Sequence, residues 1–290
     1  MTQSSDAERI YLLERHEKEL QRLTAQHDFI KLNTQDHLLA PQLLSGQKNL
    51  KVLDSGCADG LWLRELAERL SGQEPQLHGV DISPALYPSK ESQVTSNIDL
   101  RVHNISQPFP SDWHWENSFD IIHQRLLIWG IQVPQWPAVL RNHFQILKPG
   151  GYIQLAEVEW IPQGGFPDDR PQLQRMGKLQ TWFSEKNGMD FDITRKLGGL
   201  LKDVGFESVD TLDFPLNYGS LAPPEWRTPS SKFSTEVFAG LANRMDGKSI
   251  PGVASTPEEF LAFLSELKDD IYEFGYQPRI SFVFGRKPAI

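Results

Sequence analysis

Apolar and polar positions repeat with two different periods along the chain, and this pattern predicts an α/β fold. Between Leu50 and Leu155, short apolar runs of strand type alternate with segments of helical period. In the first unit, residues 50–53 read as a strand and residues 61–70 as a helix with leucines on one face. Strands that alternate with helices are typical of a largely parallel sheet covered by helices.

The same reading predicts further elements on both sides of this unit. Strands are expected at residues 76–82, 100–105, 119–123, 152–157, 208–214 and 280–284. Helices are expected at residues 6–32, 35–45, 136–147, 171–187, 194–204, 231–245 and 257–273. The stretch 216–275 therefore separates the last two strands of the predicted sheet.

A glycine-bracketed loop after the first predicted strand is the strongest local motif. Gly56 and Gly60 bracket the loop, and Asp54 precedes it. Glycine lets a ligand approach the backbone closely, and the following helix start, with Asp59 as expected N-cap, offers N–H groups to an anion. The next strand ends near Asp81, 21 residues after Gly60, where a carboxylate can accept from both ribose hydroxyls. A nucleotide-type site at the carboxyl ends of parallel strands is therefore predicted.

Four segments, in this order, carry a resemblance to a known family. They are Val52-Leu-Asp-Ser-Gly-Cys-Ala-Asp-Gly-Leu-Trp62, Gly79-Val-Asp-Ile-Ser83, Phe119-Asp-Ile-Ile-His-Gln-Arg-Leu-Leu127 and Leu147-Lys-Pro-Gly-Gly-Tyr-Ile-Gln154. Over about residues 20–215 the chain resembles class I S-adenosylmethionine-dependent methyltransferases. More narrowly, it resembles the fungal secondary-metabolite group with gliotoxin-type N-methyltransferases and, more distantly, LaeA-like regulators. It departs from the usual pattern at Ala58, where that pattern has a glycine.

The resemblance implies a Rossmann-like fold of class I methyltransferase type. Its sheet has seven strands, mostly parallel, with the last strand antiparallel. Residues 1–45 are then expected to form an N-terminal helical lid, and residues 46–290 the methyltransferase domain. Within that domain, residues 216–275 are expected to be an insertion on the substrate side.

The resemblance also implies S-adenosylmethionine as cofactor and assigns residues to it. The expected cofactor-binding residues are Asp54, Gly56, Cys57, Ala58, Gly60, Asp81, Ile82, Asn104, Ile105, His123 and Gln124. The glycine loop would line the methionine end, Asp81 would bind the ribose, and Ile82 and Asn104 would contact the adenine. The backbone near His123 would receive the amino group.

Two residues are expected to act on the acceptor's proton or amine. His123 is the preferred general base, because imidazole titrates near neutrality without help. A histidine that ends a buried strand is equally often structural, and that alternative stays open. Glu157 is the second expected catalytic residue, at the end of the fifth strand. Residues expected to contact the substrate are His27, Arg125, Trp129, Trp160, Trp182 and Tyr218.

Composition narrows the functional classes. The net charge is −9 and no Lys/Arg-rich run occurs, which argues against nucleic-acid binding and against an anionic membrane surface. The one cysteine excludes an intramolecular disulfide, and no apolar run is long enough to span a membrane. The N-terminus has no signal-peptide pattern, so we expect a cytoplasmic protein. Because the histidines at 103, 114, 123 and 143 lack helical metal spacing, we expect no metal.

The leading hypothesis is methyl transfer to a small hydrophobic or aromatic acceptor, with nitrogen favoured over oxygen and then sulfur. A LaeA-like regulatory protein is an alternative, although the chain lacks a basic extension. A nicotinamide dehydrogenase is disfavoured, because the loop does not read G-x-G-x-x-G. A cofactor-dependent pericyclase would keep the same cofactor site, so only product analysis separates it from a methyltransferase.

Overall fold

The computed structural model describes residues 17–44, 49–242 and 249–289, which cluster into two compact units. The first unit contains the described residues up to Asp36 together with Val158–Asp192 and Phe214–Ile280. The second contains His37–Glu157, Ile193–Asp213 and the chain from Ser281 onward. Each unit is therefore built from segments that lie far apart in the sequence.

A seven-stranded sheet with the order β3-β2-β1-β4-β5-β7-β6 forms the centre of the second unit. Its strands are β1 (Lys51–Ser55), β2 (Gln76–Asp81), β3 (Ile98–Val102), β4 (Phe119–Arg125), β5 (Leu147–Glu159), β6 (Glu207–Pro215) and β7 (Arg279–Arg286). The order reverses between β1 and β4, which is the point where ligands bind in open α/β sheets.

The sheet is mixed, and its last strand runs against the others. The pairs β1–β2, β1–β4, β2–β3 and β4–β5 are parallel. In contrast, Lys287 just beyond the end of β7 pairs with the start of β5. Its N–H donates to the Gly151 carbonyl over 2.8 Å, and its own carbonyl accepts from the Gly150 N–H over 2.9 Å. This pairing makes β7 antiparallel to β5 and confirms the predicted fold.

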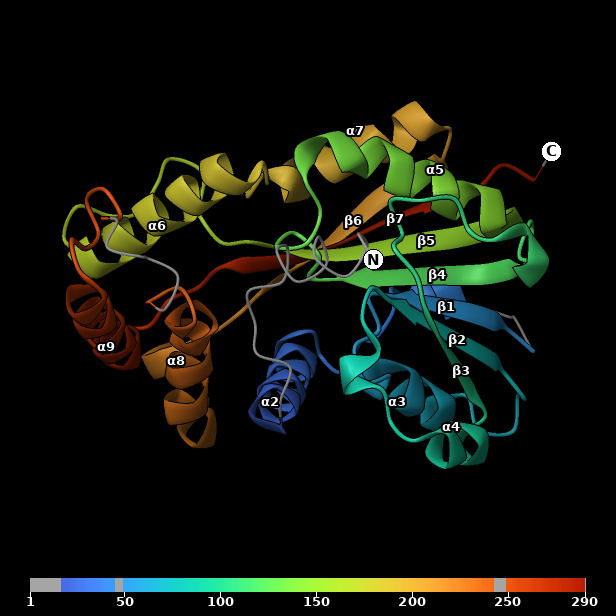
Figure 1. Cartoon of the computed structure of the whole chain (residues 1–290), viewed down its shortest axis with the longest axis horizontal. Helices are drawn as coiled ribbons and strands as arrows, with labels where there is room; N and C mark the ends of the chain where they lie inside the picture. Colours follow the sequence, from blue (N-terminus) through green and yellow to red (C-terminus); the bar gives the residue numbers. More distant parts are fainter. Residues whose placement is uncertain (1–16, 45–48, 243–248, 290) are drawn as a thin grey trace, which may run out of the picture. The chain divides into compact units, whose positions relative to one another are not determined.

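Helices cover both faces of this sheet (Figure 1). One face carries α3 (Leu61–Arg69) and α4 (Lys90–Ser96), and the other carries α5 (Trp136–Ile146) and α7 (Ile193–Val204). Because both faces are covered, β4 is buried along nearly its whole length. The carboxyl ends of the parallel strands remain as the edge at which a ligand can meet the backbone.

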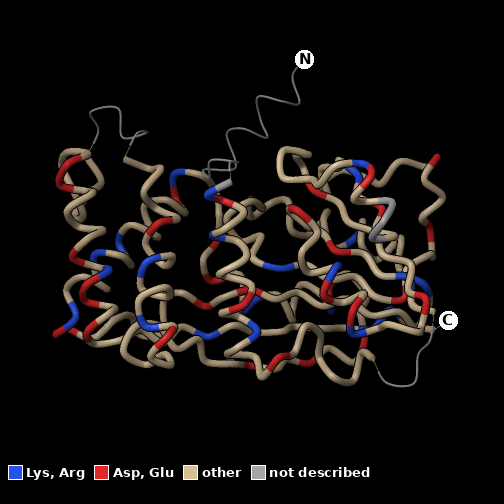
Figure 2. Tube along the Cα trace, turned by 90° about the horizontal axis from the view of Figure 1, so that it is seen from below, with Lys and Arg blue, Asp and Glu red and all other residues tan. Residues whose placement is uncertain are grey.

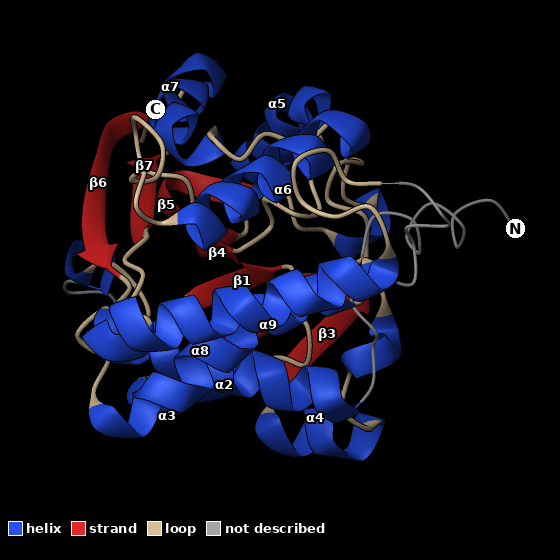
Figure 3. Ribbon diagram, turned by 90° about the vertical axis from the view of Figure 1, so that its left-hand side faces the viewer, coloured by secondary structure: helices blue, strands red, loops and turns tan. Residues whose placement is uncertain are grey.

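The first unit is largely helical. It contains α2 (Glu17–Asn33), α6 (Pro171–Asn187), α8 (Pro224–Ala239) and α9 (Pro257–Phe274), and α8 packs against both α2 and α9 (Figure 3). Phe29 of α2 is fully buried, with its ring centroid 4.6 Å from that of Tyr218 and 5.2 Å from that of Phe233. An aromatic cluster therefore holds α2 to α8.

Short 3₁₀ helices occupy several connections. They are η1 (Pro41–Leu44), η2 (Pro84–Leu86), η3 (Ser111–Trp113), η4 (Val133–Gln135) and η5 (Gly219–Leu221). The predicted helix at 35–45 is wrong, since only η1 forms there and residue 45 lies outside the described residues. Gln35 and Asp36 adopt left-handed backbone angles, φ 54° and 66°, which end α2. Of the predicted helix at 6–32, residues 1–16 also lie outside the described part.

Other boundaries differ from the predictions for identifiable reasons. α8 begins at Pro224 rather than 231, because proline is accepted in the first helical turn. β3 ends at Val102, which leaves residues 103–105 in a loop. β5 begins at Leu147, so the Lys-Pro-Gly-Gly stretch lies inside this strand, opposite an irregular register between Phe119 and Ile121.

Basic residues (Lys and Arg) and acidic residues (Asp and Glu) are interspersed along the described trace (Figure 2). Among the described residues, no helix is long and apolar enough to cross a membrane.

Candidate active site at the carboxyl edge of the sheet

The glycine loop joins β1 to α3 with three residues in the left-handed region. Gly56, Ala58 and Gly60 have φ of 81°, 49° and 80°. The Gly56 and Cys57 N–H groups both donate to the Val80 carbonyl, over 2.8 and 3.0 Å. The loop is therefore fastened to the neighbouring strand β2, and its tight course depends on the small side chains at these positions.

Asp81 connects the end of β2 to the same loop. Its Oδ2 accepts from the Ala58 N–H over 3.0 Å, and its Oδ1 accepts from the Ser83 N–H over 3.1 Å. The residue is half-buried. A carboxylate offers about four acceptor sites, so this orientation is compatible with further donors such as the hydroxyls of a ribose.

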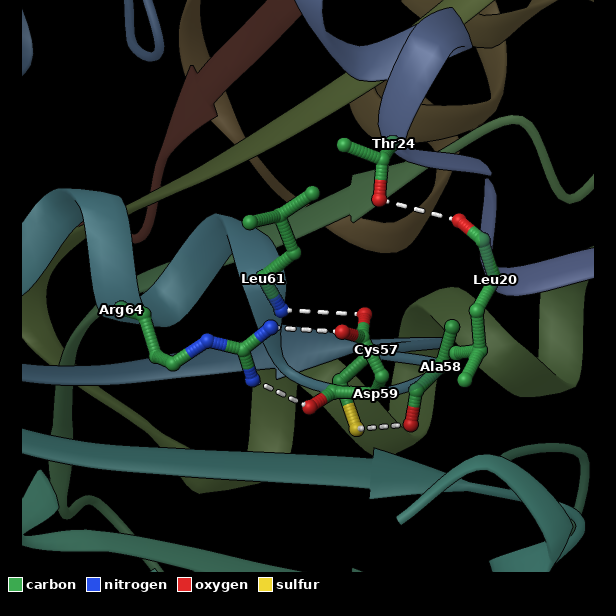
Figure 4. Close-up of polar contacts among 7 residues, drawn as sticks. All are labelled: Leu20, Thr24, Cys57, Ala58, Asp59, Leu61 and Arg64. Carbon is green, nitrogen blue, oxygen red and sulfur yellow. Dashed lines mark hydrogen bonds and ion pairs between the residues drawn. The ribbon is translucent and has the colours of Figure 1, made fainter. Parts of the chain in front are cut away.

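Asp59 lies two residues before the first residue of α3, Leu61. The N-cap is Gly60 rather than the predicted Asp59, but the Asp59 Oδ1 does accept from the Leu61 N–H over 3.2 Å. Its Oδ2 lies 2.5 Å from an Arg64 guanidinium nitrogen (Figure 4). The Asp59 carboxylate therefore already accepts from an N–H group at the start of this helix. Its negative charge disfavours the phosphate of a dinucleotide at the same place.

His123, Asp54 and Trp62 form a buried cluster on the α3 face of the sheet. His123 Nδ1 lies 2.8 Å from Asp54 Oδ1, and the His123 ring stacks on the Trp62 ring at 3.9 Å and 2°. His123 is only 1% exposed, and its Nε2 and the Trp62 Nε1 have no hydrogen-bond partner among the described residues. Burial lowers the pKa of His123, although the Asp54 bond opposes this, so the neutral ring is favoured.

A second buried polar cluster lies near the same strand ends. His143 Nε2 on α5 lies 3.1 Å from the Ser55 hydroxyl, and Ser55 is in register with Gln124 of β4. The Gln124 amide nitrogen and oxygen have no partner among the described residues. Burial lowers the pKa of His143 to about 3, so this imidazole stays neutral.

Glu157 has partners different from those predicted. The side chain is fully buried, and its Oε1 and Oε2 accept from the Leu127 N–H over 2.7 Å and the Ile128 N–H over 3.4 Å. Burial raises the pKa of Glu157 to about 8, against the opposing effect of these two N–H groups. An acceptor amine would have to compete with the backbone for this carboxyl group, so the geometry does not favour Glu157 as its ligand.

The remaining predicted cofactor residues lie around the loop or on the next connection. The Cys57 thiol is buried and its pKa is raised well above the usual range, mainly by burial, while its N–H donates to the Val80 carbonyl and its carbonyl accepts from the Gly60 N–H. Asn104 is exposed beyond β3, and its Oδ1 accepts from the Ser106 N–H and hydroxyl over 3.0 and 2.8 Å. Ile82 and Ile105 are both half-buried beyond the ends of β2 and β3.

The predicted substrate residues divide between the two units. Arg125 and Trp129 belong to the second unit, with the cofactor set, whereas His27, Trp160, Trp182 and Tyr218 belong to the first. His27 and Tyr218 are buried, and the Trp160 carbonyl accepts from the Tyr276 hydroxyl. Trp182 lines an open groove of about 570 Å³ on α6, together with Phe166, Lys178 and Glu185. Their roles in substrate binding stay predictions.

Sequence reasoning did not assign roles to two side chains beside the loop. Trp62 stacks on His123, and Leu127 packs against Gly56. The position of Trp62 in the first turn after the glycine loop was the available signal. No local signal marks Leu127, because its contact joins residues 71 positions apart. In the described part of the chain, no group of three or more His, Cys, Asp or Glu residues is arranged to hold a metal ion.

Comparison with known proteins identifies the family. The family described as "Methyltransferase domain" matches residues 25–211. The chain belongs to this methyltransferase family. The N-methyltransferase sirN of Leptosphaeria maculans is 32% identical over 97% of this chain and 95% of that protein. The N-methyltransferase gliN of Aspergillus fumigatus is 30% identical over 99% of this chain and 100% of that protein.

Solved structures share the fold at low sequence identity. Phosphoethanolamine N-methyltransferase 2 of Haemonchus contortus, solved with S-adenosyl-L-methionine, has a TM-score of 0.51 and 17% identity. The match covers 85% of this chain and 50% of that chain. The predicted family, fold and dependence on S-adenosylmethionine are thus confirmed, whereas the roles assigned to single residues stay predictions.

Proposed function

We propose that this methyltransferase acts on a small hydrophobic or aromatic secondary metabolite, with nitrogen preferred as acceptor over oxygen and then sulfur. Support for nitrogen as the acceptor atom comes from two relatives, matched over nearly their whole length, that are named N-methyltransferases. For the cofactor end of the reaction, the observation that carries the proposal is the hydrogen bond from the Ala58 N–H to Asp81, which joins the glycine loop to an acid at the next strand end. Cytoplasmic location and a lid formed by residues 1–45 stay predictions.

The residues of this edge fit S-adenosylmethionine. Asp54 and Asp81 place two carboxyl groups beside the loop, in addition to Asp59, which is ion-paired with Arg64. This arrangement suits a cofactor carrying a sulfonium and an ammonium charge better than one carrying a pyrophosphate. Asp81 would hold the ribose, the loop backbone the methionine end, and Ile82 the adenine face. When bound, this cofactor supplies a methyl group on a positively charged sulfur.

The protein's part in the reaction is orientation and exclusion of water. A well-aligned pair of reactants can lower a barrier by about 7–11 kcal/mol, so a general base is not the main requirement. His123 would have to meet the acceptor through Nε2 to serve as base. Since it is 1% exposed and stacked under Trp62, we favour its alternative role as a support for the loop.

Replacement of Asp81 tests the cofactor site. Asp81→Ala should weaken S-adenosylhomocysteine binding, measured by calorimetry, by at least about tenfold, because charge-assisted bonds to the ribose are lost. Asp99→Ala is the matched control, since Asp99 on β3 bonds to His78 and Arg101 instead of the loop. Equal affinity of wild type and Asp81→Ala would reject the ribose assignment.

Mass spectrometry tests the reaction itself. A candidate amine incubated with the protein and S-adenosylmethionine should gain one methyl group, with one S-adenosylhomocysteine formed for each product. A product of unchanged mass would indicate the pericyclase alternative. Cofactor binding without turnover of any metabolite amine, phenol or thiol would favour the regulatory alternative.

A further inference from the structure

We infer that Glu157 is a positioning residue, which holds the turn after β4 so that Leu127 packs against Gly56 and supports the glycine loop. This inference rests on the proposed function, because it takes that loop to be the cofactor-binding element. It gives Glu157 a role without contact to either substrate. All residues concerned belong to the second unit.

The turn after β4 is held by Glu157 on one side and by its own backbone on the other. Leu126 adopts a left-handed conformation, φ 56°, and its N–H donates to the Ala156 carbonyl over 3.0 Å. The Leu127 carbonyl accepts from the N–H groups of Gly130 and Ile131 over 2.8 and 3.0 Å. The Leu127 N–H faces the Glu157 carboxyl group at 2.7 Å. Both backbone groups of Leu127 are therefore fixed.

The side chain of Leu127 then fills the space above Gly56. A Cβ atom placed on Gly56 would lie 2.7 and 2.9 Å from the two Leu127 methyl carbons, closer than real contacts allow. Leu127 thus occupies the volume that any larger residue at Gly56 would need. A shift of the turn would remove this support from a residue whose φ of 81° already requires a tight course.

The carboxyl group suits this task because one of the two N–H groups that it binds, that of Ile128, belongs to a buried residue and is shielded from water. Ile128 is fully buried, and Glu157 itself is 0% exposed. A buried N–H without an acceptor is strongly unfavourable, so a residue lacking side-chain oxygen would force the turn to rearrange. Glutamine would preserve one oxygen for Leu127, whereas leucine would preserve only the volume.

The test compares Glu157→Leu with Glu157→Gln. Glu157→Leu should weaken S-adenosylhomocysteine binding by calorimetry at least about tenfold, and Glu157→Gln by no more than about threefold. Hydrogen exchange without cofactor should accelerate at the Leu127 and Ile128 amides in Glu157→Leu alone. Leu201→Ala, a buried cavity variant in α7, controls for general destabilisation and should leave both readouts unchanged.

Leu127→Ala gives an independent route if Glu157→Leu does not fold. This variant should also weaken binding about tenfold, and adding Glu157→Gln to it should have no further effect, because both act through one contact. The inference is overturned if Leu127→Ala, or a folded Glu157→Leu, binds S-adenosylhomocysteine with wild-type affinity and Asp81→Ala binds it weakly. If Asp81→Ala instead binds the cofactor product as tightly as the wild type does, the ribose assignment within the proposed function fails, and that failure is distinct from failure of this inference.

Discussion

At the scale of single residues, Ala58 is under backbone strain that a glycine would avoid. Its φ of 49° lies in the left-handed region, and alanine pays about 1 kcal/mol there. Ala58→Gly should therefore raise the free energy of unfolding by up to about 1 kcal/mol in urea titrations. Ala67→Gly, inside α3, is the control and should lower it by about 1 kcal/mol. A loss of stability in Ala58→Gly would show that the strain is absent.

Glu157 predicts a specific pH dependence of stability. Burial raises its pKa from 4.5 to about 8, so the folded state retains a proton that the unfolded chain has lost over this interval. The contribution of Glu157 to stability is fully present below pH 4.5 and is lost as pH rises through 8, by roughly 1 kcal/mol per pH unit. Urea unfolding should be measured from pH 5 to 8.5 for wild type and for Glu157→Gln. The difference between their free energies of unfolding should show this slope. A difference that stays constant across this pH range would contradict the prediction.

At the scale of elements, the Asp54–His123–Trp62 cluster fastens α3 to the sheet. His123→Ala would leave the buried Asp54 carboxylate without its imidazole partner and remove the ring beneath Trp62. We expect a loss of about 3 kcal/mol in the free energy of unfolding. His78→Ala, which removes a half-buried histidine bonded to the partly exposed Asp99, should cost clearly less. A His123→Ala protein as stable as wild type would reject the supporting role.

The elements of the core were predictable because their sequence pattern is local. Each strand from β1 to β7 and each long helix of the alternating region was expected within several residues. The failures lie where a local pattern competes with backbone geometry. The left-handed Gln35 and Asp36 ended α2 and left only η1, although residues 35–45 have helical composition. The helix α8 also contains two prolines, Pro224 in its first turn and Pro229 inside it.

At the scale of the whole molecule, the first unit depends on contacts between distant segments. Phe29 is 0% exposed and lies within 5.7 Å, between ring centroids, of Tyr218, Trp226 and Phe233. Phe29→Ala should lower the free energy of unfolding by about 3–5 kcal/mol in calorimetric or urea experiments. Phe274→Ala is the control, because Phe274 is 59% exposed and its loss should matter by about 0.5 kcal/mol or less. Similar effects of the two variants would exclude this cluster as a major source of stability.

The sequence by itself determined the sheet, the glycine loop and the acid at the end of β2. These features depend on short periodic patterns and on spacings of about twenty residues, which adjacent parallel strands convert into proximity. Only the tertiary structure decided what His123 and Glu157 contact. Asp54, the partner of His123, lies 69 positions before it in the sequence, and Leu127 lies 30 positions before Glu157. No local pattern encodes which buried groups will meet. Burial then set their protonation, because desolvation depends on the packing of the whole unit.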